Sequence, residues 1–379
     1  MEYKKLGDIA TYINGYAFKP EQRGSEGLPI IRIQDLTGNA YDLGYYNGDY
    51  PKKVELNDGD VLISWSASLG VYLWNRGKAL LNQHIFKVVF DKVEIDKFYF
   101  MYAVEYNLDK MSLKTHGATM KHITKKDFDN VVIPYPDLDY QKEVAYRLTS
   151  LKGIIENYKK QLDLLDELVK ARFVEMFGDP VTNDMLWNTD VLKDICTKIG
   201  SGSTPRGGKE SYIDEGISLI RSMNVHNAYF EYKDLAHITL DQAEKLNNVV
   251  VEHDDLLFNI TGASVARCCV VPSDVLPARV NQHVCILRCR EKINPIFLQG
   301  LLVNENYQGK LLQIAKSGAT REAINKQQLE SLEIMIPPLE LQNQFASFVE
   351  EIDKSRCRIQ KSLEASQELF DSLMQEYFG

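Results

Sequence analysis

Cysteine is scarce in this sequence, and the cysteines that are present form no CxxC pair. The 379 residues include six cysteines, all in the second half. A disulfide framework or a zinc ribbon needs paired cysteines, so we expect reduced thiols and a cytoplasmic protein. Cys285 and Cys289 lie four residues apart near His283 and could suggest a metal site, but the valine and isoleucine around them favour buried hydrophobic side chains.

Long apolar runs and an excess of positive charge are also missing. No run reaches the roughly 18 apolar residues of a membrane span, and the first residues lack the apolar centre of a signal peptide, so no membrane partner is expected. The net charge is −9, with four of the excess negative charges in residues 339–379. This balance weakens a nucleic-acid interpretation without excluding it, because a nearly neutral domain can still carry a basic face.

Motifs for enzymatic chemistry fail in detail. Gly202 and Gly207 have the spacing of a phosphate-binding loop, but Gly208 stands where its lysine belongs. A GxGxxG motif fails because Pro205 occupies the third glycine position. We find no NPPY-like or DPPF-like tetrapeptide for amino methylation and no clustered metal ligands. The sequence therefore predicts no enzyme, no metal and no cofactor bound by this chain.

What the sequence does contain is an internal duplication. Residues 79–86 read ALLNQHIF and residues 278–286 read ARVNQHVCI, so Asn-Gln-His recurs 199 residues later. HGATMKHITKKDF from His116 likewise matches SGATREAINKQQL from Ser317, at a shift of 201 that holds to the end of the chain. Four segments are predicted, comprising two globular domains at 1–137 and 179–338 and two helical segments at 138–178 and 339–379.

Each domain is predicted to have an α/β (α+β) fold. Short apolar or β-branched runs bounded by Gly, Pro, Asn and Asp predict strands at 29–33, 60–64, 86–90, 219–220, 255–259 and 284–287. Helices are expected at 97–110 and 294–312.

The matched terminal segments predict long helices with a heptad seam. Apolar residues recur in steps of four and three, and only Arg356 and Ser366 interrupt them. The seam consists of Val144, Leu148, Leu151, Ile155, Tyr158, Leu162, Leu165, Val169, Phe345, Val349, Ile352, Ile359, Leu363, Phe370 and Leu373.

These helices could pack on their own domains or pair with each other. Each copy spans roughly 36 residues, or about 54 Å, which is too long for a compact domain to cover, so a coiled coil is favoured. Gly178 and Pro180 end the first helix, and the second domain begins near Asp190. So short a connection favours antiparallel pairing over parallel pairing.

Two similar domains on a rigid pair of helices suit the two half-sites of duplex DNA. Phosphate contacts would come from a lysine-rich segment around a Gly-Ala-Thr turn, from its second copy, and from a Gly/Ser-rich loop with its partial match. The candidate DNA-binding residues are Lys19, Lys114, Gly117, Thr119, Lys121, Lys125, Lys126, Ser203, Thr204, Arg206, Lys209, Lys316, Gly318, Thr320, Arg321 and Lys326.

Two alternatives stay open for these features. The lysine-rich segment could be an ordinary solvated loop. Asn82-Gln83-His84 and Asn281-Gln282-His283 are interpreted as polar structural turns whose side-chain amides satisfy backbone groups in both domains, with direct DNA contact as the alternative.

The ordered landmarks TPxGG, GDVLIS, NQH and GAT, followed by Pro-x-Leu-x-x-Gln and a long helix ending in Phe-Gly, resemble the specificity subunit of Type I restriction-modification systems. The resemblance covers nearly the whole chain. It implies two target recognition domains that read a bipartite, asymmetric DNA site, and antiparallel helices that set the spacer. It also implies docking of two methyltransferase subunits that use S-adenosylmethionine, and of restriction subunits, with no catalysis by this chain.

Two other functions remain as alternatives. A coiled-coil scaffold that binds protein or glycan ligands would keep the architecture without DNA. An enzyme fused to its own DNA reader would need a catalytic motif, and both halves lack one.

Overall fold

The computed structural model describes residues 2–39, 42–114, 124–316 and 322–379. They form two compact units. Unit 1 consists of residues 1–159 and 361–379, and unit 2 of residues 160–360. Each compact unit includes part of both long helices. This division differs in kind from the four segments that the sequence repeat defines, and those segments stay a prediction.

Unit 1 is built on two four-stranded sheets and a short two-stranded ribbon. The first sheet is antiparallel, in the order β2-β9-β6-β7. The second has the order β4-β3-β8-β5, in which β3 and β8 run parallel. The strands are β1 (Tyr3–Lys5), β2 (Thr11–Asn14), β3 (Leu28–Ile31), β4 (Gly44–Tyr46), β5 (Glu55–Leu56), β6 (Val61–Ser64), β7 (Gly70–Leu73), β8 (Ala79–Leu81), β9 (Ile85–Val89) and β10 (Val132–Pro134), with β1 paired to β10.

Unit 2 repeats this topology strand for strand. Its sheets have the orders β12-β19-β16-β17 and β14-β13-β18-β15, again with one parallel pair, β13 and β18, and its ribbon pairs β11 with β20. The predicted duplication is therefore confirmed in the fold. The strands are β11 (Thr189–Val191), β12 (Cys196–Ser201), β13 (Ile217–Ile220), β14 (Ala236–Ile238), β15 (Val250–Val251), β16 (Leu256–Asn259), β17 (Cys268–Val270), β18 (Ala278–Val280), β19 (Val284–Cys289) and β20 (Glu333–Met335).

Short helices connect the strands. They are α1 (Leu6–Ile9), α2 (Ile33–Thr37), α3 (Lys97–Lys114), α4 (Lys125–Asp129), α6 (Leu192–Ile195), α7 (Leu240–Glu244), α8 (Pro295–Val303), α9 (Glu305–Lys316) and α10 (Lys326–Glu330). Single 3₁₀ turns lie at Pro20–Gln22, Lys52–Val54, Gly208–Ser211, Ser222–Asn224, Asn247–Val249, Gly262–Ser264 and Ser273–Val275.

Two local expectations from the sequence are wrong. The helix expected at 294–312 is two helices, because Asn304 leaves the helical conformation and its Oδ1 accepts from the backbone N–H of Asn306 at 3.0 Å, capping α9. The strand expected at 29–33 ends at Ile31, because Arg32 begins a turn in which its backbone N–H donates to Asp35 at 2.8 Å.

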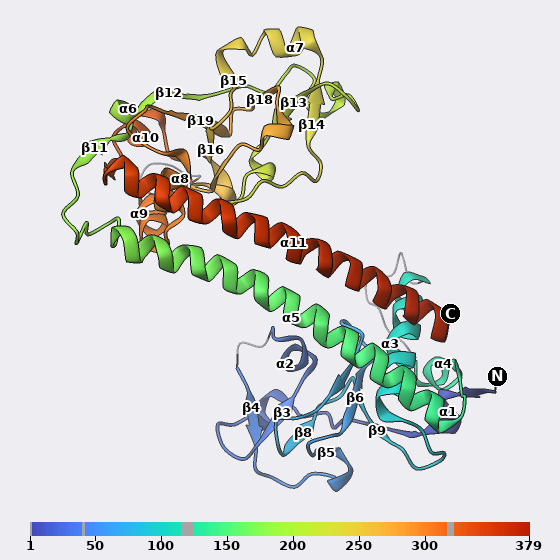
Figure 1. Ribbon diagram of the computed structural model, residues 1–379. Coiled ribbons are helices and arrows are strands. Elements are labelled where there is room, and N and C mark those ends of the chain that lie inside the picture. The colour runs from blue at the N-terminus through green and yellow to red at the C-terminus, as the bar shows by residue number, and fades with distance from the viewer. Residues whose placement is uncertain (1, 40–41, 115–123, 317–321) are drawn as a thin grey trace. The chain divides into compact units, whose positions relative to one another are not determined.

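The long helices are α5 (Leu138–Phe177) and α11 (Leu339–Phe378), drawn in green and red in Figure 1. In unit 1, Arg147 donates to the Tyr377 hydroxyl at 3.2 Å. In unit 2, the rings of Phe173 and Phe345 lie 5.5 Å apart. Within each unit, early residues of one helix therefore meet late residues of the other, so the pairing is antiparallel.

The structure places every predicted seam residue in a buried or half-buried position. Of the two interruptions, Arg356 forms an ion pair with Asp166 across the helices in unit 2. Gly178, with a φ of 75°, ends α5 in the left-handed conformation that favours glycine.

Both helices supply core residues. In unit 1, Val144 and Leu148 of α5 and Met374, Tyr377 and Phe378 of α11 are buried in one cluster with the antiparallel sheet. In unit 2, the corresponding cluster contains an aromatic group made of Phe173, Phe177, Phe297 and Phe345. Burying one such ring contributes about 1.5–3 kcal/mol, so the helices are part of each unit's core. Across the described ranges, none of the helices combines the length and hydrophobicity needed to cross a bilayer.

Candidate nucleic-acid interface

The repeated Asn-Gln-His turn occupies the same place in both units, between the two four-stranded sheets of each. The backbone N–H of Asn82 donates to Ile31, and that of Asn281 to Ile220, both at 3.1 Å. The asparagines are 7% and 6% exposed. Each turn therefore continues the strand pairing of β3 with β8 or of β13 with β18.

The histidines of the turns make a second matched contact. The carbonyl of His84 accepts from the backbone N–H of Trp65 at 3.4 Å, and that of His283 from Ile260 at 2.9 Å. The predicted structural role is confirmed for the second copy, where Asn281 Oδ1 accepts from the His283 N–H at 3.0 Å. In the first copy, Asn82 Oδ1 has no partner among the described residues, so the predicted side-chain bond is absent there.

A glycine stands against each turn. A Cβ on Gly15 would lie 1.9 Å from the carbonyl oxygen of Asn82, and one on Gly202 would lie 1.8 Å from that of Val280. Only a residue without a side chain permits this approach. Lys19 follows Gly15 by four residues in unit 1, and Arg206 follows Gly202 by four residues in unit 2, so the turns anchor two loops that each carry a cation.

The candidate residues on these loops are exposed, namely Lys19, Ser203, Thr204, Arg206 and Lys209. The Thr204 hydroxyl donates to the Gln282 side chain, which joins the loop to the Asn-Gln-His turn. In the described parts of the chain, no carboxylate forms an ion pair with Lys19, Arg206 or Lys209. Their charge is therefore available to a ligand.

The Gly-Ala-Thr segments are only partly described. Gly117, Thr119, Lys121, Gly318, Thr320, Arg321 and the Lys114 side chain lie outside the described residues. Of the flanking candidates, Lys125, Lys316 and Lys326 form ion pairs with Asp129 at 2.6 Å, Glu322 at 4.0 Å and Glu330 at 3.6 Å, respectively, while Lys126 is exposed. These pairs reduce the net charge that three of the lysines present.

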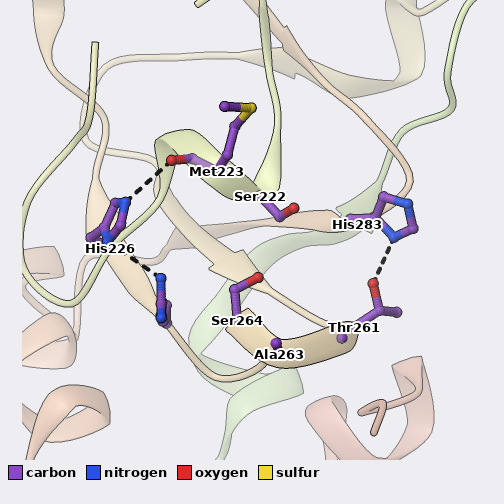
Figure 2. Close-up of a pocket in the computed structure, with 9 residues that line it drawn as sticks. Ser222, Met223, His226, Thr261, Ala263, Ser264 and His283 are labelled. Carbon is purple, nitrogen blue, oxygen red and sulfur yellow. Dashed lines mark hydrogen bonds between the residues drawn. The ribbon is translucent and has the colours of Figure 1, made fainter. Parts of the chain in front are cut away.

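A pocket of about 520 Å³ lies beside the turn in unit 2 (Figure 2). The close-up shows His283 and Thr261 on one side and His226 and Met223 on the other. His283 Nδ1 is 2.6 Å from the Thr261 hydroxyl, and His226 Nδ1 is 3.4 Å from Arg267 Nη1. The described residues lining the pocket are Ser222, Met223, His226, Thr261, Gly262, Ala263, Ser264, Arg267 and His283, and they include no acid.

The second Gly-Ala-Thr segment borders this pocket through its described flank. The N–H of Gly262 donates to the carbonyl of Glu322 at 2.9 Å. The sequence marks the Asn-Gln-His turn and the Gly-Ala-Thr segment as candidates, but not Arg267 or His226. The signal that could have identified Arg267 and His226 is a difference between the two halves of the sequence. Neither residue has an identical counterpart in the first half, although neighbouring segments do.

Four of the six cysteines are buried, whereas Cys289 is half-buried and Cys357 is exposed. Burial raises the pKa of the Cys285 thiol to about 12. A protonated thiol is a poor metal ligand. Among the described residues, no group of three or more His, Cys, Asp or Glu side chains could hold a metal ion.

Comparison with known proteins agrees with this architecture. The family model of the Type I restriction modification DNA specificity domain matches residues 1–166 and 185–367. The chain belongs to this family.

Individual relatives match over most of their length. The Type I restriction enzyme EcoBI specificity subunit of Escherichia coli is 24% identical, with 94% of this chain and 80% of the relative covered. The MjaVIII specificity subunit of Methanocaldococcus jannaschii is 22% identical, covering 93% and 86%. The crystal structure of the Type I restriction-modification system S subunit from M. genitalium is similar in fold, with a TM-score of 0.63 at 14% identity, covering 100% of this chain and 96% of that one.

Proposed function

We propose that this protein is the DNA-reading subunit of a Type I restriction-modification complex, and that each unit reads one half of a bipartite, asymmetric site. The observation that carries this proposal is the duplicated junction. In each unit, an Asn-Gln-His turn with a buried asparagine and a close-approach glycine anchor an exposed loop bearing Lys19 or Arg206. Exposed cations on anchored loops suit backbone phosphates. The family match supports DNA over protein or glycan ligands.

The long helices are proposed to carry the partner subunits. Tyr146, Leu164 and Leu168 of α5 are 74%, 50% and 46% exposed. Exposed apolar side chains along a helix suit a protein partner. We assign this surface to two methyltransferase subunits that bind S-adenosylmethionine and methylate adenine N6, with restriction subunits joining the same complex. In this proposal the chain itself performs no catalytic step and acts on DNA in the cytoplasm.

The partner subunits would also supply part of the positive charge that neutralises the DNA phosphates. The chain carries a net charge of −9, and three candidate lysines are paired with acids. Phosphate neutralisation by this chain alone is therefore modest, and the affinity for DNA is expected to be highest in the assembled complex.

Methylome sequencing tests the proposal. Source cells are compared with cells lacking this gene and with cells in which it is restored. We expect one bipartite N6-methyladenine motif to disappear on deletion and to return on complementation. An identical set of methylated motifs in all three strains would refute the function.

Domain exchange provides the matched control. Replacing residues 1–137 with the corresponding domain of another family member should change one half of the motif and leave the other half unchanged. A change in both halves would contradict the assignment of one half-site to each unit.

A further inference from the structure

We propose that Arg267 reads a guanine in the half-site recognised by unit 2, and that His226 positions it. This inference rests on the proposed function and adds to it the residue and the base. It follows from a comparison of the two units at matched positions.

The two units share the framework around this position. The Arg32 guanidinium donates to the carbonyl of Asp42, and that of Arg221 donates in the same way to Asp234. Thr261 and His283 face each other in unit 2, where unit 1 has Ser66 and His84. Where the surrounding residues are repeated so closely, a residue that differs between the two units is a candidate for the contact that distinguishes their half-sites.

Arg267 is such a difference. In unit 1, the strand register pairs Ser64 with Gly70. In unit 2, Asn259 corresponds to Ser64 and is opposed by two residues. Its backbone N–H donates to the carbonyl of Arg267, and its carbonyl accepts from the N–H of Ala266, both at 2.8 Å. Unit 2 thus has Ala266 and Arg267 at the place where unit 1 has the single residue Gly70, and Arg267 adds a guanidinium there. Both halves of a DNA reader need phosphate contacts, whereas an asymmetric site needs different base contacts, so this asymmetry favours a base.

His226 holds the guanidinium in place. Its Nε2 lies 3.2 Å from the carbonyl of Met223, which can only accept, so Nε2 is assigned as the donor. Nδ1 of the neutral ring is then the acceptor for Arg267 Nη1 at 3.4 Å. The ring is fixed by stacking on Tyr229, with centroids 4.6 Å apart and planes 13° apart.

The pocket wall behind the arginine is rigid. The Asn259 side chain, fully buried, donates to the carbonyls of Ser222 at 2.9 Å and Val225 at 3.2 Å. On the opposite side, Gln282 Nε2 lies 3.1 Å from His283 Nε2. These contacts fix both sides before any ligand binds, which favours selective binding.

The chemistry of the pocket selects a ligand rich in acceptors. Among its described lining residues are one guanidinium and two imidazoles, with no carboxylate to compete for them. The guanine edge in the major groove offers O6 and N7 as paired acceptors, and the fork of an arginine matches that pair. Adenine and cytosine place an amino donor on the same edge, so they would face the guanidinium unfavourably.

The test uses the assembled complex with its methyltransferase partners. In the unmodified protein, each guanine of the unit 2 half-site is replaced in turn by 7-deazaguanine, which lacks N7. We expect the substitution to lower the rate of methylation of the duplex at one of these guanine positions only. In Arg267→Ala, the motif should become degenerate at that same position, with the preference for guanine reduced about 5- to 150-fold, and the 7-deaza substitution there should have no further effect.

Positioning by His226 is tested with two variants. His226→Ala should relax the same base position by a smaller factor than Arg267→Ala. His226→Asn keeps an acceptor and should restore part of the preference. Lys193→Ala removes one exposed positive charge from unit 2 outside the pocket and should leave the motif unchanged.

Several outcomes would overturn the inference. An unchanged motif in Arg267→Ala, with a salt dependence of binding flatter by about 0.9, would show a phosphate contact instead. Full activity on every 7-deaza duplex would exclude reading of N7. If the unmodified complex shows no motif that depends on this gene, the proposed function has failed before Arg267 is tested.

Discussion

Gly202→Ala should destabilise unit 2, because the glycine touches the strand that leads into the Asn-Gln-His turn. The new Cβ would lie 1.8 Å from the carbonyl oxygen of Val280, whereas real Cβ contacts stay above 3.0 Å. The loop and β18 must therefore separate by more than 1 Å. This movement would also stretch the hydrogen bond from the Gly202 N–H to the Asn281 carbonyl, now 3.1 Å long.

The expected cost has two parts. Overpacking of this kind costs about 1–3 kcal/mol, and loss of the hydrogen bond about 0.5–1.5 kcal/mol more. Together they amount to about 1.5–4.5 kcal/mol. For a unit of about 200 residues, 1 kcal/mol corresponds to roughly 2–4 °C in Tm, so the transition of unit 2 should fall by about 3–18 °C.

Calorimetry of the full-length protein measures this shift. Gly200→Ala is the matched control, because Gly200 lies two residues earlier, in β12, and nothing lies within 4 Å of its added Cβ. Its Tm should stay within about 1–2 °C of the unmodified protein, since it introduces no clash. Equal transitions for Gly200→Ala and Gly202→Ala would refute the close-approach argument.

Two further predictions concern ion pairs and DNA contacts. Arg288→Ala should lower the free energy of unfolding of unit 2, measured with denaturant, by about 3–5 kcal/mol. The reason is that Asp255 is fully buried and accepts from the guanidinium through two contacts of 2.8 Å. A loss below about 1 kcal/mol would contradict this reasoning. Changing Lys121, Lys125 and Lys126 together to alanine should weaken DNA binding by the complex and flatten the log–log salt slope by up to about 2–3; an unaltered slope would show that these lysines do not touch phosphate.

The long-range regularities of this fold were visible in the sequence. The shift between the Asn-Gln-His copies predicted the duplication. The steps of four and three between apolar residues predicted two long helices, and their seam residues are buried or half-buried in the structure. These features depend on periodicity and repetition, which a single chain displays directly.

The contacts between residues at the candidate site could not be predicted from the sequence. Gly15 and Asn82 are far apart in the sequence, and nothing local marks one as the contact of the other. Asn304 divides a helix because its side chain competes for backbone N–H groups, an effect that apolar periodicity does not detect. Arg267 belongs to no sequence motif, and only the strand pairing shows that Ala266 and Arg267 lie where unit 1 has Gly70.

The composition of the unit 1 core has a consequence for synthesis. Met374, Tyr377 and Phe378 belong to the same buried cluster as Leu6 and Ile9. The core of unit 1 therefore cannot be completed on the ribosome until residues 374–378 are translated, roughly 10–45 s after residue 159 at about 5–20 residues per second. A chain that stops before residue 374 would therefore lack part of the core that surrounds its own first helix, and the defect would appear in unit 1 although the missing residues come more than 200 positions later.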